Sequence, residues 1–249
     1  MCEKISIFVV LIFILIFIKM KRLLAISLAF SFVGSFAYAQ LPTLSNKEKK
    51  QGWILLFDGK TSDGWKSYRN RPFPEKGWVI ENGALTIDPA GKGGDIITEE
   101  QFTNFELSIE FRITKGANSG IKYFILPGSN LGYEFQILDD EVHPDAKLGK
   151  DGNRLQGGLY DVIPPKGKKD KPVGEWNHAR IISKGNHVEH WLNGKKVVEF
   201  ERGSDAFKAM VADSKFKGNE SWGTPVSAPV LLQDHGDVVS FRNIKIRRL

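Results

Sequence analysis

The feature that most constrains the fold of this chain is a series of short segments in which apolar and polar residues alternate. The clearest segment runs from Phe105 to Ile113, where every second side chain is apolar and the intervening ones are polar. Alternation with a period of two is typical of a strand that buries one face and exposes the other. Comparable segments follow one another with Gly, Asn, Pro and Asp between them. This rhythm predicts an all-β protein.

Two Asn-Gly pairs, at residues 82–83 and 193–194, lie between such segments and predict tight hairpins. A short helix at 204–211 is the only helix that we expect. Strands at this spacing favour a two-sheet antiparallel jelly-roll sandwich, with an up-and-down barrel as the alternative. The expected strands are 53–57, 78–80, 84–87, 105–113, 121–126, 131–138, 176–183, 188–192, 196–200, 231–233 and 238–246.

The first 39 residues do not fit this rhythm. Two apolar runs, 5–18 and 23–36, flank Met20 and three basic residues, and an A-x-A sequence ends at Ala39. We expect 1–39 to be a signal peptide region with its true start at Met20 and cleavage after Ala39. A membrane hairpin or an uncleaved anchor is the alternative, but each run is shorter than the roughly 20 residues of a bilayer span. The protein is then exported to the periplasm or beyond, without a stable membrane span.

After cleavage the chain would consist of a polar lead-in, 40–51, and a single catalytic domain, 52–249. The one cysteine, Cys2, precedes the cleavage site. A mature chain without cysteine has no disulfide scaffold, thiol nucleophile or thiolate metal site. Four of 35 basic and one of 29 acidic residues precede residue 40, which leaves 31 minus 28, or +3. No basic block remains, so we expect no nucleic-acid partner.

Residues 131–143 carry the most informative polar pattern. Glu134 and Gln136 fall on one face of the expected strand, and apolar and aromatic residues fall on the other. Side chains at i and i+2 lie about 6.6 Å apart along a strand, close enough to bind neighbouring hydroxyls of one sugar ring. The strand then runs into Asp139, Asp140 and His143. A sugar site on a sheet and a solvated surface strand are both compatible with this pattern.

Other polar residues add candidates for the site. Glu110 and Arg112 share the polar face of the 105–113 strand, where they could pair with each other or with Glu134. Two histidines, His190 on a strand and His235 at a strand end, are candidate general bases. For each of these residues a structural role is the simpler alternative.

Six motifs in order give the chain a resemblance to a known family. They are W-I-L-L-F-D-G-K-T-S-D-G-W at 53–65, G-A-N-S-G at 116–120, G-Y-E-F-Q-I-L-D-D at 132–140, G-E-W-N-H-A-R at 174–180, V-E-H-W-L-N-G at 188–194 and L-Q-D-H-G at 232–236 with F-R-N-I at 241–244. Residues 52–249 thereby resemble the 3-keto-disaccharide hydrolase, or 3-keto-glucoside 1,2-lyase/hydratase, domain family. The resemblance implies an exported, concanavalin A-like jelly roll that acts on glucosides or disaccharides oxidised at C3.

The implied chemistry follows from the ketone. A carbonyl at C3 acidifies the hydrogen on C2, so a base can remove it and the enolate can expel the glycosidic oxygen from C1. Water then adds to the resulting 2-hydroxy-3-keto-glucal. Such a site needs a base, donors for the enolate oxygen and an acid for the leaving group. Our hypothesis assigns Glu134 or His190 as the base.

The remaining roles are assigned by residue type. Asp139, Asp140 and His235 are candidate acid, orienting or metal-binding groups. No cofactor is certain, but a divalent cation held by Asp139, Asp140 and His143 could stabilise the enolate. The expected substrate-binding residues are Glu110, Arg112, Asn118, Gln136, Tyr160 and Trp222.

Two alternative functions remain open at this level. A non-catalytic glycan-binding module would carry exposed aromatic side chains, with Trp65, Tyr160 and Trp222 as candidates. A retaining glycosidase acting on unoxidised glucan would need two carboxylates about 5 to 5.5 Å apart. Gln136 stands where the second carboxylate of such a pair would be expected.

Overall fold

The structure, a computed structural model, describes residues 41–249. The expected signal peptide region, 1–39, with Met20 and the Ala39 cleavage site, lies outside the described residues. No helix in the described part of the chain has the length and apolarity that a membrane crossing requires.

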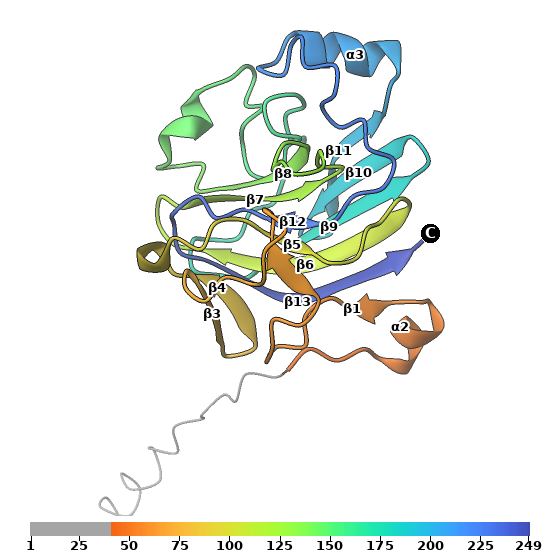
Figure 1. Ribbon diagram of the computed structural model, residues 1–249. Helices are drawn as coiled ribbons and strands as arrows, with labels where there is room; N and C mark the ends of the chain where they lie inside the picture. The colour runs from red at the N-terminus through yellow and green to blue at the C-terminus, as the bar shows by residue number, and fades with distance from the viewer. Residues whose placement is uncertain (1–40) are drawn as a thin grey trace, which may run out of the picture. The chain divides into compact units, whose positions relative to one another are not determined.

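Two antiparallel sheets form the domain, as the alternation predicts (Figure 1). The eight-stranded sheet A has the order β11-β10-β9-β6-β13-β4-β3, with β1 paired to β13. Its strands are β1 (Ile54–Leu55), β3 (Trp78–Glu81), β4 (Ala84–Ile87), β6 (Phe105–Ile113), β9 (Asn177–Lys184), β10 (His187–Leu192), β11 (Lys195–Glu201) and β13 (Val239–Arg248). The five-stranded sheet B has the order β2-β5-β12-β7-β8. Its strands are β2 (Trp65–Ser67), β5 (Ile96–Thr98), β7 (Asn118–Tyr123), β8 (Tyr133–Leu138) and β12 (Leu231–Leu232).

The core lies between the two sheets. Alternate residues of β6 and β8 point into it and are almost fully buried. The rings of Phe111 on sheet A and Phe135 on sheet B meet edge to face, with centroids 6.4 Å apart. The residues that alternate with these core positions along each strand therefore point away from the core. On β8 these residues include Glu134 and Gln136, which lie on the outer face of sheet B.

The all-β sandwich and most of the expected strands are confirmed. The expected 121–126 strand is β7, which begins earlier, at Asn118, and ends earlier, at Tyr123, because residues 118–120 already pair with β8. The expected helix is α3 (Asp205–Ala212), capped by Ser204. The short strands β2 and β5 were not expected. Helix α2 (Asn46–Lys50) lies in the expected polar lead-in, and its capping box of Ser45 and Glu48 is readable in the sequence.

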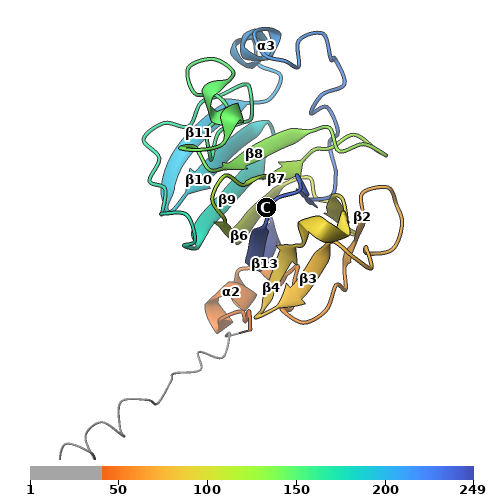
Figure 2. The same cartoon turned by 90° about the vertical axis from the view of Figure 1, so that its left-hand side faces the viewer.

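Long loops cover the outer face of sheet B. In Figure 1 the green segment after β8, with the 3₁₀ turn η2 (Pro144–Lys147), and the blue helix α3 lie above β7 and β8, whereas β6 and β13 lie below them. Figure 2 shows the same order from a second side. A second 3₁₀ turn, η1 (Pro89–Gly91), precedes β5. Polar side chains of β7 and β8 are therefore enclosed between a sheet and a layer of loops.

Candidate active site on the outer face of sheet B

Four polar side chains meet on the outer face of sheet B, and we call them the Glu134 patch: Lys122, Glu134, Gln136 and Gln233. Lys122 on β7 lies directly opposite Glu134 on β8 in the strand register. Gln233 follows β12, whose Leu232 pairs with β7. Strand pairing thus brings residues from three separate parts of the chain to one carboxylate.

The carboxylate of Glu134 is the centre of this patch. Lys122 Nζ lies 3.4 Å from Glu134 Oε2. In the amide orientation that gives each group a partner, the nitrogens of Gln136 and Gln233 lie 3.2 and 3.3 Å from Glu134 Oε1. The Gln233 oxygen then accepts from Lys122 at 3.1 Å. These three side chains can each donate a hydrogen bond to the carboxylate.

Gly120, which pairs with Gln136 on β8, makes room for this arrangement. A Cβ atom at position 120 would lie 2.4 Å from Glu134 Oε1. Any larger residue would therefore push the carboxylate out of its place on the sheet.

Burial controls the charge of Glu134. The residue is 7% exposed, and removal from water raises its carboxyl pKa, an effect that the Lys122 and Lys215 ammonium groups oppose. A carboxylate with a raised pKa is a stronger base than an exposed one. Glu134 has the environment of a general base.

A charged and aromatic cluster from the loops lies beside the patch. Arg154 donates to Asp145 and Asp161 at 2.6 Å each, and its guanidinium lies over the ring of Tyr160. Lys215 Nζ lies 4.0 Å from the centre of the same ring. Burial and the Asp145 carboxylate raise the pKa of the half-buried Tyr160 well above its usual value. The Tyr160 phenol therefore stays protonated and can donate.

His143 and His235 form a pair that is linked to this cluster. The rings of His143 and His235 meet edge to face with centroids 6.3 Å apart. His143 Nδ1 accepts from the backbone N–H of Asp145 at 3.1 Å, which leaves its proton on Nε2. Because Asp145 also pairs with Arg154, this histidine pair is connected to the Tyr160 cluster.

The nominated metal ligands do not converge on one point: among the described residues, the one group of three or more His, Cys, Asp or Glu side chains whose ligand atoms lie within 4.8 Å of one another does not include them. Asp139 accepts the backbone N–H groups of residues 116, 141 and 142, so both of its oxygens hold the loop in place. Asp140 pairs with Lys168 and accepts the Gln156 N–H, while burial raises its carboxyl pKa. Nδ1 of His143 accepts the Asp145 N–H, so each of the three residues already has a partner of its own.

His190 is not a surface base. It is fully buried on the core side of β10, where Nε2 lies 2.7 Å from the hydroxyl of Tyr123 and Nδ1 lies 3.2 Å from the Gly157 carbonyl. Burial lowers its pKa to about 4, so it is neutral near pH 7. The core between the sheets separates it from the outer face that carries Glu134, and we withdraw it as a candidate base.

Glu110 and Arg112 lie on the other side of the sandwich. Both point outward from β6 in sheet A, so neither can pair with Glu134 on sheet B. Glu110 accepts from Arg242 at 2.7 Å, and the guanidinium of Arg112 lies over the ring of Trp176. Their role is structural, and we withdraw them as substrate-binding residues.

Of two further predicted substrate-binding residues, Asn118 lies beside the Glu134 patch and Trp222 does not. Asn118 is buried at the start of β7, on the same face as Lys122, and its backbone N–H donates to Asp237. It borders the Glu134 patch. Trp222 is 6% exposed, stacks on Phe216 and donates to the Gly132 carbonyl. It anchors the 214–222 loop and cannot act as a sugar platform in this position.

Four residues of the site were missed from the sequence: Lys122, Arg154, Lys215 and Gln233. The period-two pattern could have placed Lys122 on the outer face, because Ile121 and Tyr123 beside it are apolar. The other three lie in loops or at a strand end, where no periodicity applies.

Several known proteins are similar to this chain in sequence and structure. A 3-keto-disaccharide hydrolase of Bacteroides thetaiotaomicron is 35% identical over 255 residues, covering 89% of this chain and 87% of that protein. A crystal structure of a candidate glycosyl hydrolase from Parabacteroides distasonis superposes with a TM-score of 0.75 at 31% identity, covering 84% of this chain and all of that one. A second such protein from the same organism gives a TM-score of 0.60 at 29% identity, covering 79% and 99%.

The family model gives the most specific match. Residues 52–247 match the model of the 3-keto-alpha-glucoside-1,2-lyase-like domain, which accounts for almost the whole described chain. The match confirms the family resemblance of the six motifs and includes every residue of the Glu134 patch. The chain therefore belongs to the 3-keto-alpha-glucoside-1,2-lyase-like family.

Proposed function

We propose that this protein cleaves the glycosidic bond of glucosides or disaccharides oxidised at C3, by elimination across C1 and C2 followed by hydration. The observation that carries the proposal is the buried Glu134 carboxylate surrounded by Lys122 and two amides. The name of the Bacteroides relative and that of the family support the 3-keto substrate class.

In the first step the carboxylate of Glu134 takes the proton from C2. The C2–H electron pair becomes the C1–C2 double bond by way of the enolate, and the C1–O bond to the leaving group breaks. The raised pKa of Glu134 helps this transfer, since a more basic carboxylate accepts the proton more readily. The same carboxyl group exchanges its proton with solvent and returns one to C2 when water adds at C1 in the hydration step.

Donors around the carboxylate stabilise the negative charge. Lys122 Nζ and the amide nitrogens of Gln136 and Gln233 are already oriented toward an anionic group. A substrate whose 3-keto oxygen replaces one carboxylate contact would receive the same donors as charge develops on that oxygen. Tyr160 and His235 are the neighbouring groups that we assign to protonate the leaving oxygen and to orient water.

The structure supports this mechanism over the two alternatives. The direct neighbours of Glu134 are an ammonium and two amides, whereas a retaining glycosidase needs a second carboxylate at short distance. A glycan-binding module would present aromatic platforms, but Trp65 and Trp222 are 3% and 6% exposed, and both indole N–H groups donate to backbone carbonyls. Of the three nominated aromatics only Tyr160 borders the site.

A paired substrate assay tests the proposal. The purified protein is incubated with a glucoside and with its 3-keto counterpart in D₂O, and both leaving-group release and deuterium at C2 are followed. Cleavage of the keto form alone, with deuterium at C2 of the product, supports elimination and hydration. Cleavage of the unoxidised glucoside would instead identify a glycosidase, and binding without cleavage would identify a lectin.

A cation on the nominated residues is not part of the proposal. Asp139, Asp140 and His143 are engaged by backbone groups and Lys168, so we assign no step to a metal there. Turnover that is lost on exhaustive chelation and returns with Mg²⁺, Mn²⁺ or Zn²⁺ would contradict this assignment.

Export is a separate proposal. The signal peptide pattern of residues 20–39 supports cleavage after Ala39 and a mature domain that works in the periplasm or outside the cell. N-terminal sequencing of the protein recovered from its native cells tests it. A mature chain beginning at Gln40 supports export, and a chain that retains residues 20–39 contradicts it.

A further inference from the structure

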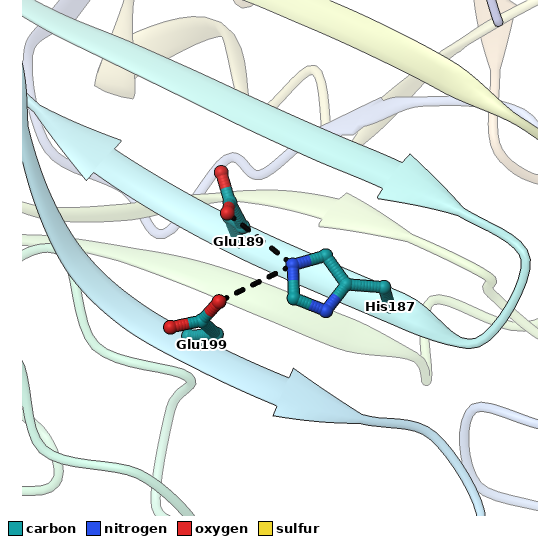
Figure 3. Close-up of side chains that lie close together, drawn as sticks. All are labelled: His187, Glu189 and Glu199. Carbon is teal, nitrogen blue, oxygen red and sulfur yellow. Dashed lines mark hydrogen bonds and ion pairs between the residues drawn. The ribbon is translucent and has the colours of Figure 1, made fainter.

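A second polar cluster lies on the outer face of sheet A, far from the Glu134 patch. His187 and Glu189 stand two residues apart on β10, and Glu199 on β11 lies directly opposite Glu189 in the strand register. All three side chains leave the same face of the sheet and point toward one another (Figure 3). Within residues 41–249 this is the only group of three or more metal-ligating side chains with converging ligand atoms.

The distances from the histidine to the two carboxylates match a tetrahedral ion, and all three ligand atoms lie within 4.8 Å of one another. His187 Nε2 lies 3.2 Å from Glu189 Oε1 and 3.4 Å from Glu199 Oε1. Atoms that bind a tetrahedral zinc at 2.0–2.1 Å are separated from one another by about 3.3 Å. A divalent ion would therefore fit between them with little movement of the strands.

Further contacts orient these side chains in the way that metal ligands require. Glu201 Oε1 lies 2.6 Å from His187 Nδ1, which holds a proton on that nitrogen, while Nε2 donates to Glu189 in the metal-free protein and would release its proton to a bound ion. Trp191 Nε1 donates to Glu189 Oε2 at 2.7 Å, which turns Oε1 toward His187 and Lys196. A carboxylate behind a ligating histidine and a hydrogen bond to a ligating carboxylate are the usual outer contacts of a bound metal.

The negative charge of the two glutamates also favours the binding of a cation. Glu189 and Glu199 are directly opposed like charges, an unfavourable pair on a sheet. Lys196 is the cation that relieves them here, with Nζ 3.1 Å from Glu189 and 2.8 Å from Glu199. Its side chain is about one-third exposed, so it can turn into solvent when another cation takes its place.

We propose that His187, Glu189 and Glu199 bind one divalent cation of the zinc class, with Glu201 and Trp191 as the orienting groups and Lys196 as the internal competitor. Imidazole nitrogen with two carboxylates is a donor set that Zn²⁺ accepts, and water completes the tetrahedron. The ion would join β10 to the edge strand β11. The site is independent of the proposed glycoside cleavage.

Zn²⁺ binding by the purified, chelator-stripped protein tests this proposal. Affinity is measured by competition with a chromogenic chelator, and the thermal midpoint is recorded with and without Zn²⁺. We expect one Zn²⁺ per chain at this site, at least tenfold weaker binding in His187→Gln, and weaker binding in Glu201→Gln by about tenfold. Lys196→Met, which removes the competitor, should bind at least threefold more tightly.

Two control variants separate this site from other histidines. His178→Gln alters a histidine on the same outer face that contacts Ser108, and His235→Gln alters the histidine pair near Glu134. Both variants should bind Zn²⁺ with the affinity of the parent protein. Equal Zn²⁺ affinity in the parent and His187→Gln, or no tightening in Lys196→Met, would overturn the proposal. An unchanged unfolding transition without Zn²⁺ verifies that each variant is folded.

Discussion

Lys122 and Glu134 face each other across β7 and β8, with Nζ 3.4 Å from Oε2 on a face of sheet B where both are at least 90% buried. A buried ion pair is weak evidence for stability, because the cost of removing both charges from water can equal their attraction. Its presence on the polar face of an enzyme sheet is better explained by chemistry.

Replacing Glu134 tests its role as the base. Glu134→Gln should lower kcat for a 3-keto-glucoside by at least about 100-fold, because general acid–base groups contribute 10²- to 10⁴-fold. Glu110→Gln is the matched control, a carboxylate of the opposite sheet that should leave kcat within about twofold of the parent. Comparable losses in both variants would refute the assignment of the site to sheet B.

Replacing Lys122 should move the pH dependence of the reaction. The ammonium lowers the pKa of Glu134, so its removal in Lys122→Met raises that pKa further. Because the base must be ionised, the acid limb of the kcat/KM profile should shift to higher pH. Lys245→Met, which loses a similar pair with Glu48 near sheet A, should leave the limb in place. A shift to lower pH in Lys122→Met would contradict a basic role for Glu134.

The buried His190 should make stability fall in mild acid. The unfolded chain binds a proton on this imidazole near pH 6.5, whereas the folded chain resists it until about pH 4. The unfolded state therefore binds more protons in that interval, and the free energy of unfolding declines as pH falls, by about 3 kcal/mol in total. The free energy of unfolding is measured by urea titration at pH 7 and at pH 4.5. The His190 contribution to the difference between these two values should be absent in His190→Gln. Parallel pH profiles for the two proteins would exclude it.

Trp222 should matter for stability and not for sugar recognition. Trp222→Ala empties a packed position against Phe216 and Tyr133, which typically costs about 3–5 kcal/mol of unfolding free energy. Trp176→Ala is the control, because Trp176 is partly exposed just before β9 and its ring lies under the guanidinium groups of Arg112 and Arg242. A Trp222→Ala protein with parental stability but weakened substrate binding would restore the platform interpretation.

The alternation rule predicted which residues share a face but not which strands are neighbours. It placed Glu134 and Gln136 together correctly, since both lie on one strand. It could not show that β6 belongs to the other sheet, so Arg112 was grouped with Glu134. Pairings between strands that are distant in sequence depend on the packing of the whole core, and a local pattern does not contain them.

His190 could have been placed correctly from the sequence. Its neighbours at i−2 and i+2, Val188 and Leu192, are apolar, so period two already assigned it to the buried face. We nominated it as a base because imidazole is the usual general base near neutral pH, and the burial pattern shows the opposite environment. Asp139 is different, because its backbone contacts belong to a loop whose path no periodicity predicts.

The strand that carries Glu134 does not end the sheet with free backbone groups. The 157–160 segment hydrogen-bonds to β8 along its outer edge, through Gln136 and the carbonyl of Glu134. The segment that supplies Tyr160 is therefore part of the same rigid hydrogen-bonded layer as the base, and it cannot swing open as a lid without breaking those bonds. The position of Tyr160 relative to Glu134 is thus set by backbone pairing before any substrate binds.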